Sequence, residues 1–405
     1  MRSLEGTPLA AEKARMLKKR DKRGKTQEAI ETMGTAVLSH EIPRRLQKEM
    51  EGTRLLAEEA FNALCLEIFA FQFERNLPYQ AYCRHKGRTP NRVRSWKEVP
   101  PVPVAAFKEF PLFCGSLEEA GVVFMTSGTT RSEKKGKHYL FGVEVYDASL
   151  KANFHRHVLP DRDRMKILAL APPPAVLPNS SLSHYLDVVI STFGEEGSGF
   201  FMGEQGLDTP RALLALDRAV DADEAVAILA TPFSLLALMD DLRATGRTLK
   251  LPEGSRLMDT GGYKGKGREV SREELYAMTA RRLSLPRSAC VSMYGMTELS
   301  SQFYDRTLVH SAQGLPPTHT MEGPPWTRTL VLDFDTLAEA RPGEPGLLAH
   351  YDLANWDSVA AILTEDLGTQ EEGGFRLHGR LKGAEARGCA AAIDELLQVS
   401  STVSR

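Results

Sequence analysis

The most informative stretch of the chain is Val122-Val123-Phe124-Met125-Thr126-Ser127-Gly128-Thr129-Thr130. Its apolar first half predicts a buried strand. The second half is a turn of hydroxyl side chains around one glycine, and backbone N–H groups and hydroxyls at such a turn are suited to phosphate oxygens. The GxxxxGK[ST] spacing of a Walker loop is absent. We therefore expect a strand that ends in a different phosphate-binding loop, the alternative being an ordinary polar strand-to-helix loop.

Positive charge follows this turn directly. The next residues are Arg131-Ser132-Glu133-Lys134-Lys135-Gly136-Lys137-His138. Lysine and arginine placed here would lie beside the negative charge of a triphosphate. Among them we assign Lys137 to phosphate contact.

Outward from this loop, short apolar runs alternate with amphipathic segments. The strand-like runs are Gly121–Met125, Lys166–Ala171, Ala225–Thr231, Arg256–Asp259 and Ala289–Tyr294. The segments with helical spacing between them are Glu144–His157, Ser181–Phe193, Phe233–Thr245 and Ser271–Leu285. This alternation is typical of an α/β fold with mostly parallel sheets sandwiched by helices. Residues 40–75 read as helix, 314–350 as loops and short antiparallel strands, and Gly374–Arg380 as a strand.

Composition narrows the class of protein. The chain has 405 residues, a formal net charge of −2 and 42% hydrophobic residues, which favours a folded core over disorder. No run approaches the roughly 18 apolar residues of a membrane helix, so we expect no membrane span. The near-neutral charge does not favour nucleic acid as the main partner. Five cysteines without a CxxC pair indicate a reducing compartment, and we expect a cytoplasmic protein.

The first 25 residues are basic, with nine Lys or Arg residues and three Asp or Glu residues. They lack the apolar segment of a signal peptide. We expect residues 1–40 to form a solvated basic arm, followed by a main domain over 41–376 and a short C-terminal segment over 377–405. The alternative is an arm that contacts nucleic acid or membrane.

Two further strand ends carry motifs. Tyr294-Gly295-Met296-Thr297-Glu298 offers a ring that could stack on adenine, a hydroxyl for phosphate, and a carboxylate of the kind that Mg²⁺ takes together with phosphate oxygens. Asp259-Thr260-Gly261-Gly262-Tyr263 ends a strand in two glycines, which let the backbone approach a flat ligand closely; the alternative is a simple turn.

Together these motifs resemble the adenylate-forming superfamily of acyl-CoA ligases, luciferases and peptide-synthetase adenylation domains. Arg131 stands where those proteins usually have glycine. The resemblance implies that Thr126–Thr130 bind ATP phosphates, that Gly261, Gly262 and Tyr263 lie near adenine and the acyl group, and that Glu298 binds Mg²⁺. Thr364-Glu365-Asp366-Leu367-Gly368 resembles the element whose aspartate holds the ribose hydroxyls. Leu377-His378-Gly379-Arg380 resembles the hinge strand, with Arg380 reaching ribose or phosphate.

Within the superfamily, Tyr294–Asp305 and Gly379–Cys389 look like the LuxE-type acyl-protein synthetases. These activate a fatty acid with ATP and hold it as a thioester on a cysteine near the C-terminus, before transfer to an acyl reductase. The resemblance implies that Cys389 is the acyl carrier, and nearby Arg387 together with the start of a predicted helix would favour its thiolate. Cys65, Cys83, Cys114 and Cys290 are assigned as structural. The chain continues for 25 residues past Arg380, so we expect most of the usual C-terminal domain and its adenylation lysine to be missing.

The residues that would contact the acid substrate are less clearly marked in the sequence. His184 follows Ser180, Ser181 and Ser183, one of which we expect to cap a helix. It would orient the carboxylate or close the acyl pocket, the alternative being a structural histidine. We expect a carboxylic acid substrate, a fatty acid by the resemblance, and an acyl-reductase-like or acyl-carrier protein as partner. The rival functions are an acyl- or aryl-CoA ligase of the phenylacetate type and a non-catalytic nucleotide-binding scaffold.

Overall fold

The computed structural model describes residues 41–52, 56–127, 134–261 and 270–380. The chain divides into two compact units, Met1–Arg45 and Leu46–Arg405. Of the first unit, residues 41–45 are described and are helical. All further structure concerns the second unit. Among the described residues, no helix combines the length and the apolar character that crossing a membrane requires.

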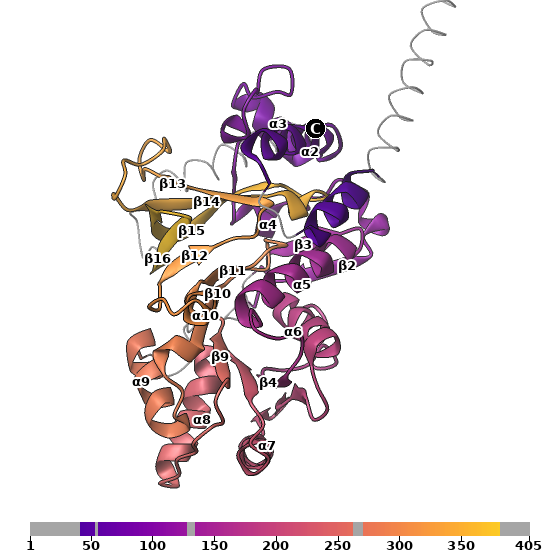
Figure 1. Ribbon diagram of the computed structural model, residues 1–405. Coiled ribbons are helices and arrows are strands. Elements are labelled where there is room, and N and C mark those ends of the chain that lie inside the picture. Colours follow the sequence, from indigo (N-terminus) through magenta and orange to yellow (C-terminus); the bar gives the residue numbers. More distant parts are fainter. Residues whose placement is uncertain (1–40, 53–55, 128–133, 262–269, 381–405) are drawn as a thin grey trace, which may run out of the picture. The chain divides into compact units, whose positions relative to one another are not determined.

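A large mixed sheet forms the centre of this unit (Figure 1). Its parallel half consists of β5 (Gly199–Phe200), β4 (Lys166–Leu170), β8 (Val226–Ala230), β9 (Arg256–Asp259) and β10 (Cys290–Tyr294). The antiparallel half continues through β11 (Phe303–Asp305), β12 (Thr320–Glu322), β16 (Gly374–Arg380), β15 (Ala361–Glu371), β14 (Gly346–Asp352) and β13 (Thr327–Leu332). The short strand β1 (Val102–Pro103) pairs with β15 in parallel. The α/β prediction is confirmed.

Helices cover both faces of the parallel half, as Figure 1 shows. The helices packed on this half are α5 (Glu144–Val158), α6 (Ser181–Phe193), α7 (Thr209–Asp221), α8 (Pro232–Ala244), α9 (Arg272–Leu283) and α10 (Thr307–Ala312). The unit also contains α2 (Glu58–Arg75), α3 (Leu77–His85) and α4 (Ala106–Glu109). Successive strand residues point to opposite faces. Leu168 and Leu170 therefore pack with α7, α8 and α9, while Ile167 and Ala169 pack with α5 and α6. Burial on both faces explains why these strands are continuous apolar runs.

Short 3-10 helices connect several of these elements: η1 (Trp96–Glu98), η2 (Leu117–Glu119), η3 (Arg287–Ala289) and η4 (Leu353–Asn355). The Ser180 hydroxyl accepts a hydrogen bond from the Ser183 N–H, so Ser180 is the residue that caps α6. A small hairpin of β6 (Met202–Gly203) and β7 (Gly206–Leu207) lies apart from the main sheet.

The strand before the phosphate loop is confirmed, but its expected place in the parallel sheet is wrong. β2 (Val122–Met125) pairs antiparallel with β3 (Lys137–Leu140) in a separate two-stranded sheet. The chain returns along β2 after the loop, so the following helix, α5, begins only after β3. The helix expected over 40–75 is also interrupted, because residues 41–51 and α2 are separate helical segments. The expected boundary at residue 377 falls inside β16.

Candidate active site

Hydrogen bonds fix both ends of the predicted phosphate loop. At its start, the Met125 N–H donates to the Asn179 carbonyl at 2.8 Å, and the Asn179 side-chain amide donates to the Val123 carbonyl at 2.9 Å. At its end, Thr126 and Gly136 bond twice: Thr126 N–H to the Gly136 carbonyl at 3.0 Å, and Gly136 N–H to the Thr126 hydroxyl at 2.9 Å. The hairpin therefore presents a loop whose two ends are held together.

The residues of this loop are only partly described. Ser127 is exposed, and Lys137 lies exposed on β3 opposite Met125, directly after the closed end of the loop. The expected contact of Lys137 with phosphate stays a prediction. Gly128, Thr129 and Thr130 lie outside the described residues.

Glu298 lies against the closed end of the loop. A Cβ added to Gly136 would be 3.1 Å from Thr126 Cγ2 and 3.4 Å from Glu298 Oε1. A hydrogen bond also joins the segment after the phosphate loop to the Tyr294–Glu298 motif. His138 on β3 donates it from Nδ1 to the Thr297 carbonyl at 2.9 Å. Burial lowers the pKa of His138 to about 4, so this ring is neutral and Nδ1 carries its proton. The phosphate loop and residues 297–298 are thereby joined side by side.

The predicted nucleoside end of the site centres on Asp366. The Tyr294 hydroxyl donates to Asp366 Oδ2 at 2.8 Å, and Arg380 lies directly opposite Asp366 in the pairing of β15 with β16. Burial raises the pKa of Asp366, while the Tyr294 hydrogen bond and the Arg380 charge oppose that shift. Asp366 and Arg380, both predicted from the resemblance, are therefore neighbours.

The charges of three carboxylates act on Arg380. Its guanidinium is 2.6 Å from Glu365. Burial lowers the pKa of Arg380, but the charges of Glu365, Asp366 and Glu298 outweigh that effect and raise it. The negative charge of Glu298, the predicted metal ligand, thus contributes to the raised pKa of Arg380, a predicted nucleoside ligand.

Tyr294 is more enclosed than its predicted role suggests. Its ring packs against Phe303, Phe375 and His350 at centroid distances of 5.8, 5.8 and 5.5 Å, and the residue is 8% exposed. Gly295 is exposed, and Met296 and Thr297 are half-buried. Stacking of Tyr294 on adenine stays a prediction, whereas its hydroxyl has a defined partner in Asp366.

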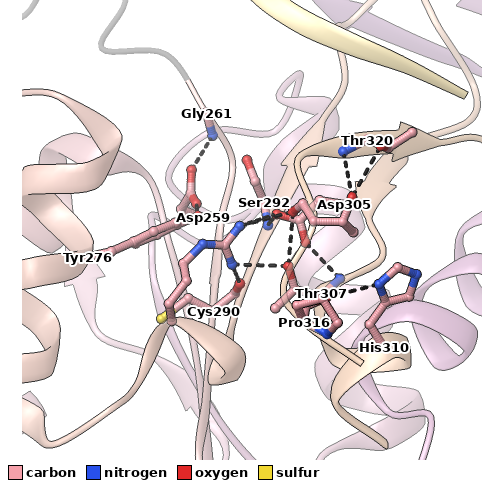
Figure 2. Close-up of polar contacts among 12 residues, drawn as sticks. Asp259, Gly261, Tyr276, Cys290, Ser292, Asp305, Thr307, His310, Pro316 and Thr320 are labelled. Carbon is pink, nitrogen blue, oxygen red and sulfur yellow. Dashed lines mark hydrogen bonds and ion pairs between the residues drawn. The ribbon is translucent and has the colours of Figure 1, made fainter. Parts of the chain in front are cut away.

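The Gly261 turn lies at the end of β9 (Figure 2). The Gly261 N–H donates to Asp259 Oδ1 at 2.9 Å, and the Tyr276 hydroxyl of α9 donates to Asp259 Oδ2. Gly261 has φ of 60°, a conformation in which glycine is favoured. Gly262 and Tyr263 lie outside the described residues. The buried Asp259 carboxylate, which sequence reasoning treated only as part of the motif, anchors this turn.

A buried polar cluster lies beside this turn, also in Figure 2. Arg287 donates to Asp305 Oδ2 at 3.2 Å, to the Thr307 hydroxyl at 3.0 Å and to the Cys290 carbonyl. Asp305 also accepts from the Ser292 N–H at 3.2 Å. These bonds tie β10 to β11 and α10, so they support the strand that carries Tyr294. Sequence reasoning assigned no role to Arg287.

His184 lies next to the strand of the phosphate loop. Its ring is 5.4 Å from Phe124 of β2 and 5.7 Å from Tyr146, and its Nε2 is 2.7 Å from Asp147 Oδ1. The pairing with Asp147 was not foreseen. Orientation of a carboxylate or closure of an acyl pocket by His184 stays a prediction.

The four cysteines assigned as structural, Cys65, Cys83, Cys114 and Cys290, are all buried. Burial raises the pKa of Cys65 and of Cys290 to about 12, which disfavours the nucleophilic thiolate. Cys389 lies outside the described residues.

The donor set fits a magnesium ion held together with nucleotide. The described residues contain no group of three or more His, Cys, Asp or Glu side chains that could hold a metal alone. Mg²⁺ is commonly held by one or two carboxylates plus substrate phosphates and water. Glu298, placed beside the predicted phosphate loop, would provide such a carboxylate.

Comparison with known proteins identifies the family. Residues 51–398 match the sequence profile of the acyl-protein synthetase LuxE. The chain belongs to the LuxE acyl-protein synthetase family. It is 21% identical over 354 residues to a long-chain-fatty-acid–luciferin-component ligase of Aliivibrio fischeri, covering 84% of this chain and 89% of that protein. The protein of the same name from Vibrio harveyi is 20% identical, with 86% and 89% covered.

Solved structures agree on the fold of this LuxE-family chain. An open conformation of 2-hydroxyisobutyryl-CoA ligase, in complex with 2-HIB-AMP and CoA, superposes with a TM-score of 0.57. The match covers 80% of this chain and 74% of the ligase at 16% identity. The LuxE-family chain therefore has the α/β fold of acyl-CoA ligase adenylate-forming domains.

Proposed function

We propose that this LuxE-family protein activates a long-chain fatty acid with Mg–ATP and then carries the acyl group as a thioester on Cys389. The observation that carries the proposal is the convergence of Thr126, Glu298, Asp366 and Arg380 from separate segments. The names of its relatives, long-chain-fatty-acid–luciferin-component ligases, support a fatty acid as the substrate.

In the first step, a carboxylate oxygen of the acid forms a bond to the α-phosphorus of ATP. The bond between the α-phosphorus and the bridging oxygen breaks, and pyrophosphate leaves with the electron pair. The loop at 126–130 and Lys137 would hold the phosphates, and Asp366 and Arg380 the ribose. Mg²⁺ bound by Glu298 would neutralise charge on the phosphate oxygens. Catalysis in this step is mainly positioning and charge stabilisation.

In the second step, the Cys389 thiolate attacks the acyl carbonyl carbon, and AMP leaves with the electron pair of the broken carbon–oxygen bond. The proton of the thiol passes to solvent when the thiolate forms. The buried environment of the other four thiols supports Cys389 as the nucleophile. The thioester would then pass to an acyl-reductase-like or acyl-carrier protein.

Mass spectrometry tests both steps together. The protein is incubated with Mg–ATP and mixed fatty acids, and the intact mass and the modified peptide are measured. We expect an acyl adduct on Cys389 that hydroxylamine removes. C389S should lose the adduct but keep ATP–pyrophosphate exchange, whereas C290S, at a buried thiol, should keep both.

Other outcomes would exclude the proposal in distinct ways. An adduct that survives C389S would exclude Cys389 as the carrier. Acyl-CoA formation without a protein adduct would indicate a CoA ligase. The absence of exchange with any acid of a broad panel would indicate a scaffold without catalytic activity.

A further inference from the structure

A line of four polar side chains ends at Asp366. The Thr329 hydroxyl on β13 is 2.9 Å from His350 Nδ1 on β14. His350 Nε2 is 3.2 Å from the Tyr294 hydroxyl on β10, which donates to Asp366 Oδ2 on β15 at 2.8 Å. The line joins four strands and ends at the carboxylate assigned to ribose.

The direction of each hydrogen bond follows from the end of the line. An ionised carboxylate only accepts, so Tyr294 donates to Asp366 and its oxygen is left to accept from His350. His350 Nε2 therefore carries a proton. Burial lowers the pKa of His350 to about 3, so the ring is neutral and Nδ1 is an acceptor. Thr329 must then donate to Nδ1, and one tautomer of His350 satisfies the whole line.

The surroundings of His350 keep its ring in this orientation. The residue is fully buried, and its ring lies 4.7 Å from Phe303 and 5.4 Å from Phe375 between centroids. Neither neighbour offers a hydrogen-bond partner. By donating to Nδ1, the Thr329 hydroxyl therefore stabilises the tautomer of His350 that the Tyr294–Asp366 hydrogen bond requires.

We propose that Thr329 and His350 are positioning residues that aim the Tyr294 hydroxyl at Asp366 and so set how tightly this carboxylate selects the ribose hydroxyls of ATP. The proposal rests on the proposed use of ATP at this site. With the opposite tautomer, Nε2 would be an acceptor, and the Tyr294 hydroxyl would turn from Asp366 toward His350. The buried carboxylate would lose its donor and its fixed orientation.

Substitution of Thr329 by valine tests the positioning role at the end of the hydrogen-bonded line that is farthest from Asp366. T329V keeps the shape of the side chain and removes the hydroxyl. T327V is the matched control, because Thr327 is on the same strand but donates to the Pro324 carbonyl at 2.8 Å. The measurement is kcat/KM in ATP–pyrophosphate exchange for ATP, 2′-deoxy-ATP and 3′-deoxy-ATP.

We expect T329V to reduce the preference for ATP over the deoxy nucleotides about three- to tenfold, mainly through KM for ATP, which is the scale of one hydrogen bond. T327V should leave the preference unchanged. Y294F and D366N should reduce it at least as much as T329V. H350Q, whose amide can both donate and accept, should retain more of the preference than H350F.

Two direct measurements make the result independent of catalysis. Calorimetric titration with ATP and 2′-deoxy-ATP should show the same loss of preference in T329V. In ¹⁵N-histidine spectra, the signal absent from H350Q should report a neutral ring protonated at Nε2. A wild-type preference in folded T329V and H350F, or the opposite tautomer, would overturn the positioning role while leaving the ligase proposal intact. Ribose selection in titrations without any exchange would instead overturn the ligase proposal alone.

Discussion

The side-chain amide of Asn355 brackets Glu298. Its Nδ2 donates to the Glu298 carbonyl at 2.8 Å, and its Oδ1 accepts from the Ser300 N–H at 2.7 Å. The Asn355 carbonyl in turn accepts from the buried amide of Gln72 in α2 at 2.8 Å. The backbone around the predicted magnesium ligand is therefore held by two segments distant in sequence.

Replacement of Asn355 by alanine should weaken magnesium use. Because N355A removes the bonds that fix the backbone at Glu298 and Ser300, we expect the Mg²⁺ concentration for half-maximal pyrophosphate exchange to rise about tenfold, as for other residues that orient metal ligands. N62A is the matched control: Asn62 also brackets a backbone segment, accepting from Trp96 N–H at 2.7 Å, but in another region. An equal shift in both variants would contradict a specific role for Asn355.

The sequence predicts the strands and helices of the parallel half well, because each of these elements is marked by a pattern within its own residues. Apolar runs such as Lys166–Leu170 and the helical spacing of Ser181–Phe193 define elements without reference to the rest of the chain. The pairing of β2 with β3 could not be predicted in this way, since the residues between Met125 and Lys137 lack a short hairpin-turn sequence.

The site residues show the same difference between local patterns and contacts that are distant in sequence. Asp366 and Glu298 stand in motifs whose order is visible in the sequence. Asn355 and His350 are single polar residues outside any motif, and their roles come from contacts with residues 57 and 56 positions away. One signal was available for His350: a histidine within a buried apolar strand requires hydrogen-bond partners.

Asp357 should make stability depend on pH. Burial raises the pKa of this carboxyl from 3.8 to about 7, and Oδ1 has no hydrogen-bond partner. The folded protein therefore holds a proton that the unfolded chain releases above pH 4, so this contribution to stability is present below about pH 4 and is lost as the pH rises to about 7.

Asp357→Asn removes this titration. Chemical denaturation at several pH values should show the stability of D357N rising relative to wild type between pH 4 and 7. The Phe141 N–H, which donates to Asp357 Oδ2 at 2.8 Å, keeps an acceptor in the variant. Parallel pH profiles for the two proteins would show that Asp357 is ionised in the folded state throughout this range.

Loss of Arg287 should destabilise the fold strongly. Asp305 is 1% exposed, and R287M would leave its carboxylate buried without a cation, at a cost of about 3 kcal/mol in the free energy of unfolding. R341M is the control, because the Arg341–Glu344 pair is exposed and should change stability by less than about 0.5 kcal/mol. Adding D305N to R287M should restore part of the loss; no recovery would mean that packing of the Arg287 side chain, and not its charge, dominates.

Gly136 should leave little room for a side chain. A methyl group there would be 3.1 Å from Thr126 Cγ2 and 3.4 Å from Glu298 Oε1, so G136A should displace these two side chains slightly, at the closed end of the phosphate loop and at the predicted magnesium ligand. We expect kcat/KM for ATP in pyrophosphate exchange to fall about tenfold or more, since small displacements at a reacting site are costly. G203A is the control, because a Cβ at Gly203 has no heavy atom within 4 Å. Wild-type exchange in G136A would show that the close packing of Thr126 and Glu298 against Gly136 is not needed for adenylation.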